Sequence, residues 1–305
     1  MNRWTGSPCS HRPQRGNEGP PIGASLGSRP DSRYRHHMAL PPPGNDRAAI
    51  VTGASSGIGE QFAEILSRRG YQVVLVARSA DRLEDLAGRL GRQAHPLPAD
   101  LSDRSERAAL LDRVSAFGLV PDILINNAGF STLGLVAKSV PEQEVNLVEV
   151  DVAAVVDLCS RFLPGMVDRH RGAVLNVASM AAFMPLPGQA AYGAAKAFVL
   201  SYTHSLRGEL RGTGVTATAL CPGPVDTGFG EAAGFSKEEA ESALPRVMWV
   251  PAEKVAQAGN DGLAAGKGVV VPGRVNQLAS AFFRVPPAEL LLPLLARNHP
   301  AMKRD

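Results

Sequence analysis

Cysteine is scarce in this sequence, and its three copies lie far apart. They stand at Cys9, Cys159 and Cys221, and no two of them form a CxxC pair. A disulfide framework needs several closely spaced cysteines in a small secreted chain, and a zinc site needs ligands at short, fixed spacings. We therefore expect no metal site, and we interpret the cysteines as structural residues of a cytoplasmic protein.

The chain also lacks a long apolar run and a strong excess of one charge. The run "LLLPLLA" near the C-terminus is interrupted by proline and is under half of the roughly 20 residues that a membrane-spanning helix needs. The 32 Lys and Arg residues nearly balance the 29 Asp and Glu residues, which leaves a net charge of +3. We expect no transmembrane segment and no nucleic-acid partner, and a small molecule as the substrate.

Residues 1–46 have no apolar periodicity. They are rich in Arg, Pro, Gly and Ser, a composition that buries too little apolar surface to offset the entropy of ordering. We predict a disordered N-terminal extension. A second methionine, Met38, stands shortly before the first strand-like run, so the native protein could also begin there.

From residue 47 the sequence alternates short β-branched runs with segments of helical length. This alternation predicts a doubly wound parallel sheet of about seven strands in one α/β domain of the Rossmann type, over residues 47–274. Residues 275–305 are predicted as a helical tail that packs on the domain or on a second subunit. The strand-like runs are "AAIV", "VVLVA", "AHPLPA", "DILI", "AVLNVA", "VTATAL" and "GVVV".

A glycine-rich loop follows the first predicted strand. In "TGASSGIG" the glycines are Gly53, Gly57 and Gly59, between that strand and an amphipathic helix. Glycine allows the tight turn and the close approach of a pyrophosphate, whose charge the helix N-terminus stabilises. The lysine of an ATP-binding or GTP-binding loop is missing, so the pattern predicts a dinucleotide cofactor.

The end of the second predicted strand points to NADP rather than NAD. A site for NAD normally has an acidic residue there for the ribose hydroxyls, but "VVLVARS" has Ala77 and Arg78. An arginine forms charge-assisted hydrogen bonds with a 2′-phosphate, and Ser79 could add another contact.

The spacing of Tyr192 and Lys196 places both side chains on one face of a helix. Ser179 precedes them at the end of the strand "AVLNVAS", which is the carboxyl edge of the sheet, where ligands of open α/β folds bind. A lysine cation and a positively charged nicotinamide favour tyrosinate, so we predict a lowered pKa for Tyr192. The three residues are candidates for proton-transfer chemistry.

These motifs occur in the order typical of one family. From about Asp46 to Gly273 the chain resembles the short-chain dehydrogenase/reductase family of the NADP-dependent type, in "TGASSGIG", "AD", "NNAG", Ser179, "YGAAK" and "PGPVDT". The resemblance implies an oxidoreductase that transfers a hydride between NADPH and a ketone or secondary alcohol. It assigns Tyr192 as general acid, Lys196 as its electrostatic partner and ribose ligand, and Ser179 as the hydroxyl that holds the substrate carbonyl. It also implies a homo-dimer or homo-tetramer.

The resemblance further implies a set of cofactor-binding residues. Asp100 should meet the adenine, Asn127 and Gly129 should line the nicotinamide, and the loop "PGPVDT" should hold the carboxamide and the diphosphate. Thr52 is interpreted instead as a residue that stabilises the glycine turn. The complete predicted set comprises Gly53, Ser55, Ser56, Gly57, Ile58, Gly59, Arg78, Ser79, Asp100, Leu101, Asn127, Ala128, Gly129, Tyr192, Lys196, Pro222, Gly223, Val225 and Thr227.

One position departs from the family pattern. The family usually has an asparagine in the helix after "NNAG", and this chain has Asp151 there, which we include among the catalytic candidates. A carboxylate accepts hydrogen bonds from a relay water but cannot donate as an amide does. Because a dry charge is costly, we expect water to reach this aspartate.

The segment after "PGPVDT" indicates an apolar substrate. "GFGEAAGFSKEEAESALPRVMWVP" contains Phe229, Phe235, Leu244, Met248 and Trp249, which could close over a fatty acyl chain, a steroid-like ring or a xenobiotic carbonyl. They could equally pack on the sheet. Two other functions remain open: a non-redox, epimerase or dehydratase reaction on the same scaffold, and a cofactor-sensing protein without turnover.

Overall fold

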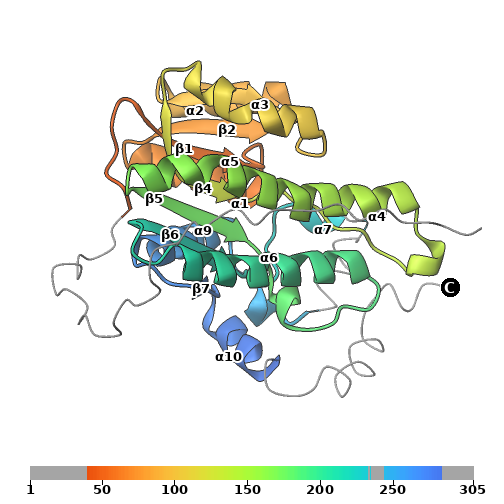
Figure 1. Cartoon of the computed structure of the whole chain (residues 1–305). Helices are drawn as coiled ribbons and strands as arrows, with labels where there is room; N and C mark the ends of the chain where they lie inside the picture. Colours follow the sequence, from red (N-terminus) through yellow and green to blue (C-terminus); the bar gives the residue numbers. More distant parts are fainter. Residues whose placement is uncertain (1–39, 233, 235–243, 284–305) are drawn as a thin grey trace, which may run out of the picture. The chain divides into compact units, whose positions relative to one another are not determined.

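One parallel sheet organises this protein. The computed structural model describes residues 40–232, 234 and 244–283. Within them seven parallel strands form a sheet of order β3-β2-β1-β4-β5-β6-β7 (Figure 1). The predicted doubly wound α/β fold is therefore confirmed. The strands are β1 (Arg47–Thr52), β2 (Gln72–Ala77), β3 (Ala94–Pro98), β4 (Val120–Asn126), β5 (Gly172–Val177), β6 (Val215–Leu220) and β7 (Val269–Val270).

Helices cover both faces of the sheet. Helices α3, α5 and α6 supply buried side chains to one face, and α1, α2 and α9 supply them to the other. The helices are α1 (Gly57–Arg68), α2 (Ala80–Leu90), α3 (Arg104–Ser115), α4 (Pro141–Val148), α5 (Ala154–Asp168), α6 (Ala190–Glu209), α7 (Phe229–Ala232), α9 (Ala252–Ala264) and α10 (Arg274–Phe283). Short helical turns are η2 (Val136–Lys138), the π-helical η3 (Glu149–Ala153), η4 (Met180–Phe183) and η5 (Arg246–Met248).

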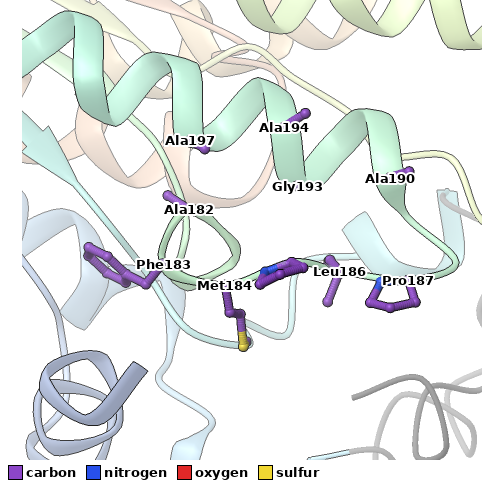
Figure 2. Close-up of a pocket in the computed structure, with 10 residues that line it drawn as sticks. Ala182, Phe183, Met184, Leu186, Pro187, Ala190, Gly193, Ala194 and Ala197 are labelled. Atoms are coloured by element: carbon purple, nitrogen blue, oxygen red, sulfur yellow. The ribbon is translucent and has the colours of Figure 1, made fainter. Parts of the chain in front are cut away.

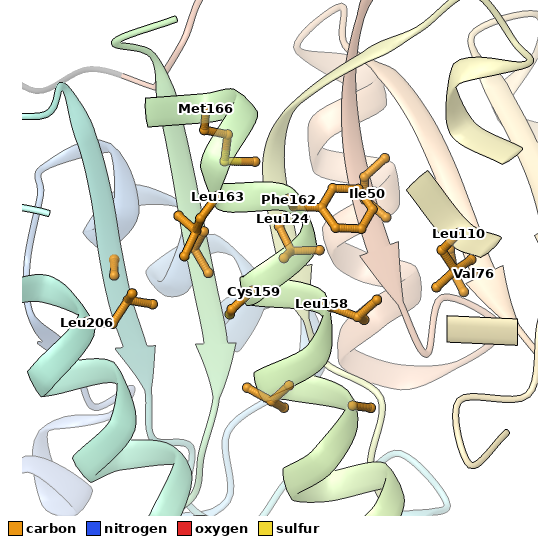
Figure 3. Close-up of a cluster of buried hydrophobic side chains, with 14 of the residues drawn as sticks. Ile50, Val76, Leu110, Leu124, Leu158, Cys159, Phe162, Leu163, Met166 and Leu206 are labelled. Carbon is orange, nitrogen blue, oxygen red and sulfur yellow. The ribbon is translucent and has the colours of Figure 1, made fainter. Parts of the chain in front are cut away.

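The two-residue period of the strands divides the core into two layers. In β1, Ala48 and Ile50 face the layer beneath α5, whereas Ala49 and Val51 face the layer beneath α1. Figure 3 shows the first layer, in which Phe162 of α5 lies against Ile50 and Leu124. The amphipathic helix predicted after the glycine loop is confirmed as α1, in which Phe62, Ile65 and Leu66 are buried. Both faces of the central strands are therefore apolar, as buried parallel strands require.

The strand order places a topological switch point at the ends of β1 and β4. These strands are neighbours in the sheet, but the chain leaves β1 toward β2 and leaves β4 toward β5, on opposite sides. In open α/β sheets, ligands bind outside the carboxyl ends of the strands at such a switch point. The glycine loop follows β1 and the "NNAG" motif begins at the end of β4, so both motifs flank this switch point.

The N-terminal boundary differs from the sequence prediction. Residues 1–39 lie outside the described residues, but residues 40–46, predicted to be disordered, contact the domain. Leu40 packs against the core beneath α1, and the Tyr71 hydroxyl donates a hydrogen bond to the Pro41 carbonyl oxygen at 2.6 Å. The composition of this stretch gave no sign of these contacts, because the groups that hold it come from distant parts of the sequence.

The C-terminal part is described only in pieces. Helix α7 begins the segment after "PGPVDT", and Phe235 of that segment lies outside the described residues. Helix α10 begins the predicted tail, and residues 284–305 lie outside the described residues. No helix in the described part of the chain has the length and apolarity needed to span a membrane.

Candidate active site

The glycine loop has the conformation that a pyrophosphate site requires. Gly53 and Gly57 have φ angles of +65° and +59°, a region that side chains with a Cβ rarely adopt. A Cβ on Gly59 would collide with the Gly53 carbonyl oxygen. Ser56 caps α1 without a side-chain hydrogen bond, so its hydroxyl leaves the first N–H groups of the helix to other acceptors. The residues present therefore fit a dinucleotide phosphate at this helix N-terminus.

Hydrogen bonds connect the ends of β1 and β4 at the switch point. The Thr52 hydroxyl accepts hydrogen bonds from the backbone N–H groups of Asn127 and Ala128 at 2.9 and 3.0 Å. In return, the Asn127 amide donates to the carbonyl oxygens of Thr52 and Gly53 at 3.0 and 3.4 Å. Thr52 thus stabilises the loop by holding two strands together, and the Asn127 amide positions the glycine loop.

Arg78 and Ser79 are exposed and follow directly after β2. Neither side chain makes a hydrogen bond or an ion pair with another residue in the described part of the chain. Ser79 is also the N-cap of α2, whose amide dipoles favour an anion.

At the end of β3, the Asp100 carboxylate accepts hydrogen bonds from the Ser102 N–H and hydroxyl at 2.9 and 2.8 Å, and Leu101 is buried in the core.

The loop after β6 lies against the glycine loop. A Cβ on Gly57 would lie 2.9 Å from the Thr227 side chain, so the glycine loop and the "PGPVDT" loop are in contact. Pro222 accepts a backbone hydrogen bond from Met180, and Val225 packs against the core beneath α1. Gly223 lies against Asn276 of α10, a contact that no sequence pattern indicated.

Tyr192, Lys196 and Ser179 converge where β5 meets α6. The Lys196 Nζ lies 5.6 Å from the centre of the Tyr192 ring and donates a hydrogen bond to the Val177 carbonyl oxygen at 3.2 Å. The Ser179 hydroxyl interacts with the phenol of Tyr192 and also accepts a hydrogen bond from the Ala181 N–H at 3.1 Å. The structure therefore brings the three predicted catalytic residues into one cluster at the carboxyl edge of the sheet.

Asp151 belongs to the same cluster, but its environment differs from the prediction. It lies in the π-helical turn η3, and its side chain is 0% exposed. One carboxylate oxygen accepts a hydrogen bond from the Phe130 N–H at 3.0 Å, and the other lies 2.9 Å from the Lys196 Nζ. The expectation that water reaches this residue is therefore wrong, because the lysine cation compensates the buried charge instead.

The same packing changes the expected ionisation of Tyr192. Burial raises the pKa of Tyr192 above its usual value, more than Lys196 and the Ser179 hydrogen bond lower it, and the Asp151 charge raises it further. The prediction of a lowered pKa is wrong for the chain by itself. For Lys196, burial is the largest effect and disfavours the ammonium, but Asp151, Tyr192 and Cys221 together outweigh it and raise the lysine pKa. Burial likewise raises the pKa of Asp151, and Lys196 offsets part of this effect.

Sequence reasoning missed the contact between Gln189 and Ser131 at the start of the helix that carries Tyr192 and Lys196. Gln189, the N-cap of α6, donates a hydrogen bond from its amide to the Ser131 hydroxyl at 2.6 Å. Gly129 admits the Asp151 carboxylate, because a Cβ there would lie 2.9 Å from both of its oxygens. Phe229, which the sequence suggested as part of a cover over an apolar substrate, lies 5.8 Å from the Tyr192 ring, centre to centre. Glutamine and serine carry no distinctive spacing, so only the fold could reveal their roles.

An apolar groove of about 580 Å³ lies on another face of α6. Figure 2 shows Phe183, Met184 and Leu186 on one side of it and the small residues Ala190, Gly193, Ala194 and Ala197 of α6 on the other. At about 100° per residue, Ala194 lies roughly 200° around the helix from Tyr192. The groove therefore does not contain the catalytic cluster.

Comparisons with known proteins match most of the described domain. The family model described as "short chain dehydrogenase" matches residues 47–237. An uncharacterized oxidoreductase of Staphylococcus epidermidis is 36% identical over 208 residues, which cover 67% of this chain and 90% of the relative.

Two solved structures extend the comparison. A short-chain dehydrogenase from Sphingobium yanoikuyae in complex with NADPH has a TM-score of 0.69 and 32% identity, and the match covers 77% of this chain and 93% of that one. A 3-ketoacyl-(acyl-carrier-protein) reductase from Brucella melitensis, complexed with NADH, has a TM-score of 0.68 and 28% identity over 75% of this chain and 96% of that one.

Proposed function

Because this chain belongs to the short-chain dehydrogenase family of oxidoreductases, we propose that it is an NADPH-dependent reductase of ketones on apolar substrates. The proposed substrates are carbonyls on a fatty acyl chain, a steroid-like ring or a xenobiotic, and the reverse reaction is oxidation of the secondary alcohol. The convergence of Ser179, Tyr192 and Lys196 is the observation that carries this proposal.

In the proposed reaction the protein positions the carbonyl and supplies a proton. NADPH, when bound, supplies the hydride that the carbonyl carbon receives. The Ser179 hydroxyl donates a hydrogen bond to the carbonyl oxygen, and Tyr192 gives that oxygen its phenolic proton. Lys196 stabilises the resulting tyrosinate and holds the ribose. The Val177 carbonyl oxygen and the Asp151 carboxylate keep the lysine in place.

The proposal of NADPH rests on Arg78, because the compared structures include complexes with both cofactors. Its exposed guanidinium has no partner among the described residues, and it stands beside the N-terminus of α2. A charge-assisted hydrogen bond to the 2′-phosphate contributes about 1.5 to 3 kcal/mol, so we expect NADPH to be preferred over NADH by about ten- to a hundredfold.

Steady-state kinetics with both cofactors test this choice. Arg78→Ala should raise the KM for NADPH and leave the KM for NADH almost unchanged. Ala77→Asp should shift the preference further, because it adds an acceptor for the ribose hydroxyls and a repulsive charge against the phosphate. If the unmodified protein uses NADH as well as NADPH, Arg78 is only a solvated residue and the cofactor proposal fails.

The proposal of an apolar substrate is supported by Phe229, whose ring lies beside Tyr192. The 3-ketoacyl reductase of Brucella melitensis offers a related precedent, since its name describes a ketone on an acyl carrier. Activity should be measured on ketones of increasing chain length, with kcat/KM expected to rise with length. A preference for short, charged ketones would contradict this substrate class, and absence of any NADPH oxidation would favour a cofactor-sensing protein.

We also propose a cytoplasmic homo-dimer or homo-tetramer. The buried thiol of Cys159 fits a reducing compartment, and exposed apolar side chains on α4 and α6 offer a surface that a second copy could cover. These side chains are Val145, Val148 and Phe198, the last stacked on Tyr202. Light scattering should give a mass of two or four chains, and Phe198→Asp should lower that mass. A monomer in both proteins would contradict the proposal.

A further inference from the structure

The ion pair between Asp151 and Lys196 is buried on both sides. The carboxylate is 0% exposed and the lysine 5% exposed, with 2.9 Å between their charged atoms. In a low-dielectric interior, such a pair interacts far more strongly than an ion pair at the surface. The π-helical turn η3 aims the carboxylate at α6, and the absence of a side chain at Gly129 makes room for it.

This pair also contributes two opposing charges to the environment of Tyr192. The charged and titratable groups that face Lys196 are Asp151 of η3, Tyr192 of its own helix and Cys221 after β6. A lysine cation on its own would favour tyrosinate, but a carboxylate beside it offsets part of that effect. An asparagine, which the family usually has at this position, would leave the charge of the lysine uncompensated.

We propose that Asp151 is the counter-ion of Lys196 and that, by offsetting the lysine charge, it helps to keep Tyr192 protonated across the neutral pH range. The tyrosine is then ready to donate a proton during ketone reduction, whereas alcohol oxidation, which needs tyrosinate as the base, runs fastest only at alkaline pH. Asp151 is therefore a positioning residue that acts through Lys196. The consequence for the reaction rests on the proposed function, but the ionisation of Tyr192 does not.

The direct test is a tyrosinate titration followed by near-ultraviolet absorbance. The absorbance change of Tyr192 itself is obtained by subtracting the titration of the same protein that also carries Tyr192→Phe. Asp151→Asn should shift this titration to lower pH by about one to two units, as expected for loss of one charge in a partly buried cluster. An unchanged or upward-shifted titration would overturn the proposal, whatever the enzyme does to ketones.

Glu149→Gln is the matched control. It removes the same charge from the same turn, but Glu149 is 45% exposed and pairs with Arg107 at 3.1 Å rather than with Lys196. The Tyr192 titration should not move in this variant. If Glu149→Gln shifts it as far as Asp151→Asn does, the effect is a general change in charge and the specific pairing is refuted.

The kinetic readout is the pH profile of alcohol oxidation. The rate of alcohol oxidation should rise with pH as Tyr192 loses its proton. In Asp151→Asn the midpoint of this rise should shift to lower pH by the same amount as the titration. One pH unit below the midpoint of the unmodified protein, oxidation should therefore be about tenfold faster. If the titration shifts and no alcohol or ketone is turned over, the ion-pair proposal stands and the proposed function fails. If the titration shifts and the midpoint stays in place, the assignment of Tyr192 as the reacting base fails.

A double-mutant cycle covers the case in which Asp151→Asn folds poorly. Lys196→Met leaves a buried carboxylate without a counter-ion and should lower the melting temperature strongly. Adding Asp151→Asn to that protein should restore part of the loss, because no unpaired charge then remains. Additive losses in the double variant would show that the two residues are not coupled and would overturn the proposal.

Discussion

At the scale of single residues, Tyr192 is the group whose chemistry the site is built around. Tyr192→Phe removes the proton that the carbonyl oxygen must receive, and a general acid contributes about 10²- to 10⁴-fold to the rate. We expect turnover to fall by at least this factor while NADPH binding, measured by fluorescence titration, stays nearly intact. Lys196→Met should damage both, since the lysine also serves as the ribose ligand in the proposed site.

Tyr202→Phe is the control for this prediction. Tyr202 lies on the same helix as Tyr192 but is partly buried against the core and stacks on Phe198, with 6.0 Å between ring centres. The same loss of a hydroxyl there should leave turnover unchanged. Near-normal activity in Tyr192→Phe would refute the assignment of the general acid.

At the scale of elements, a charged cluster fixes the start of β4 at the edge of the sheet opposite the site. The Asp122 side chain is 2% exposed and lies within 4 Å of three arginines, Arg47 of β1 and both Arg169 and Arg171 after α5. Asp122→Asn should lower the free energy of unfolding by about 1 to 3 kcal/mol, because the arginines lose their shared acceptor. Denaturant unfolding measures this loss, and the KM for NADPH should not change.

Asp112→Asn serves as the comparison for Asp122. Asp112 is exposed on α3, and its carboxylate has no partner among the residues that the structure describes. Its loss should change the free energy of unfolding by less than about 0.5 kcal/mol. Equal effects of the two substitutions would show that the arginines around Asp122 contribute nothing measurable.

At the scale of the whole molecule, the described domain should be stable without the first 37 residues. A chain that begins at Met38 keeps the contacts of Leu40 and Pro41, so it should fold, bind NADPH and melt within a few degrees of the full chain. A chain that begins at Asp46 loses those contacts and should melt at a lower temperature. Loss of soluble protein on removal of residues 1–37 would contradict the prediction.

Much of the fold could be predicted because its signals are local. The β-branched runs, the glycines at the end of β1 and the apolar stripe of α1 each express a preference of a few consecutive residues. The spacing of Tyr192 and Lys196 is equally local, since the geometry of one helix places both side chains on one face. Such features leave a readable pattern in the sequence, and the structure places each of them where the pattern indicates.

The sequence by itself determined the succession of strands and helices along the chain and the identity of the residues gathered at the carboxyl edge of the sheet. Only the tertiary structure decided the charge state and the contacts of those residues. Asp151 forms an ion pair with Lys196, and the Asn127 amide donates a hydrogen bond to the Thr52 carbonyl oxygen next to the glycine loop. Outside the site, the Tyr71 hydroxyl donates a hydrogen bond to the Pro41 carbonyl oxygen. The physical reason is that each of these contacts links segments far apart in the chain. Their energies depend on burial and distance, and neither property is encoded in the spacing of neighbouring residues.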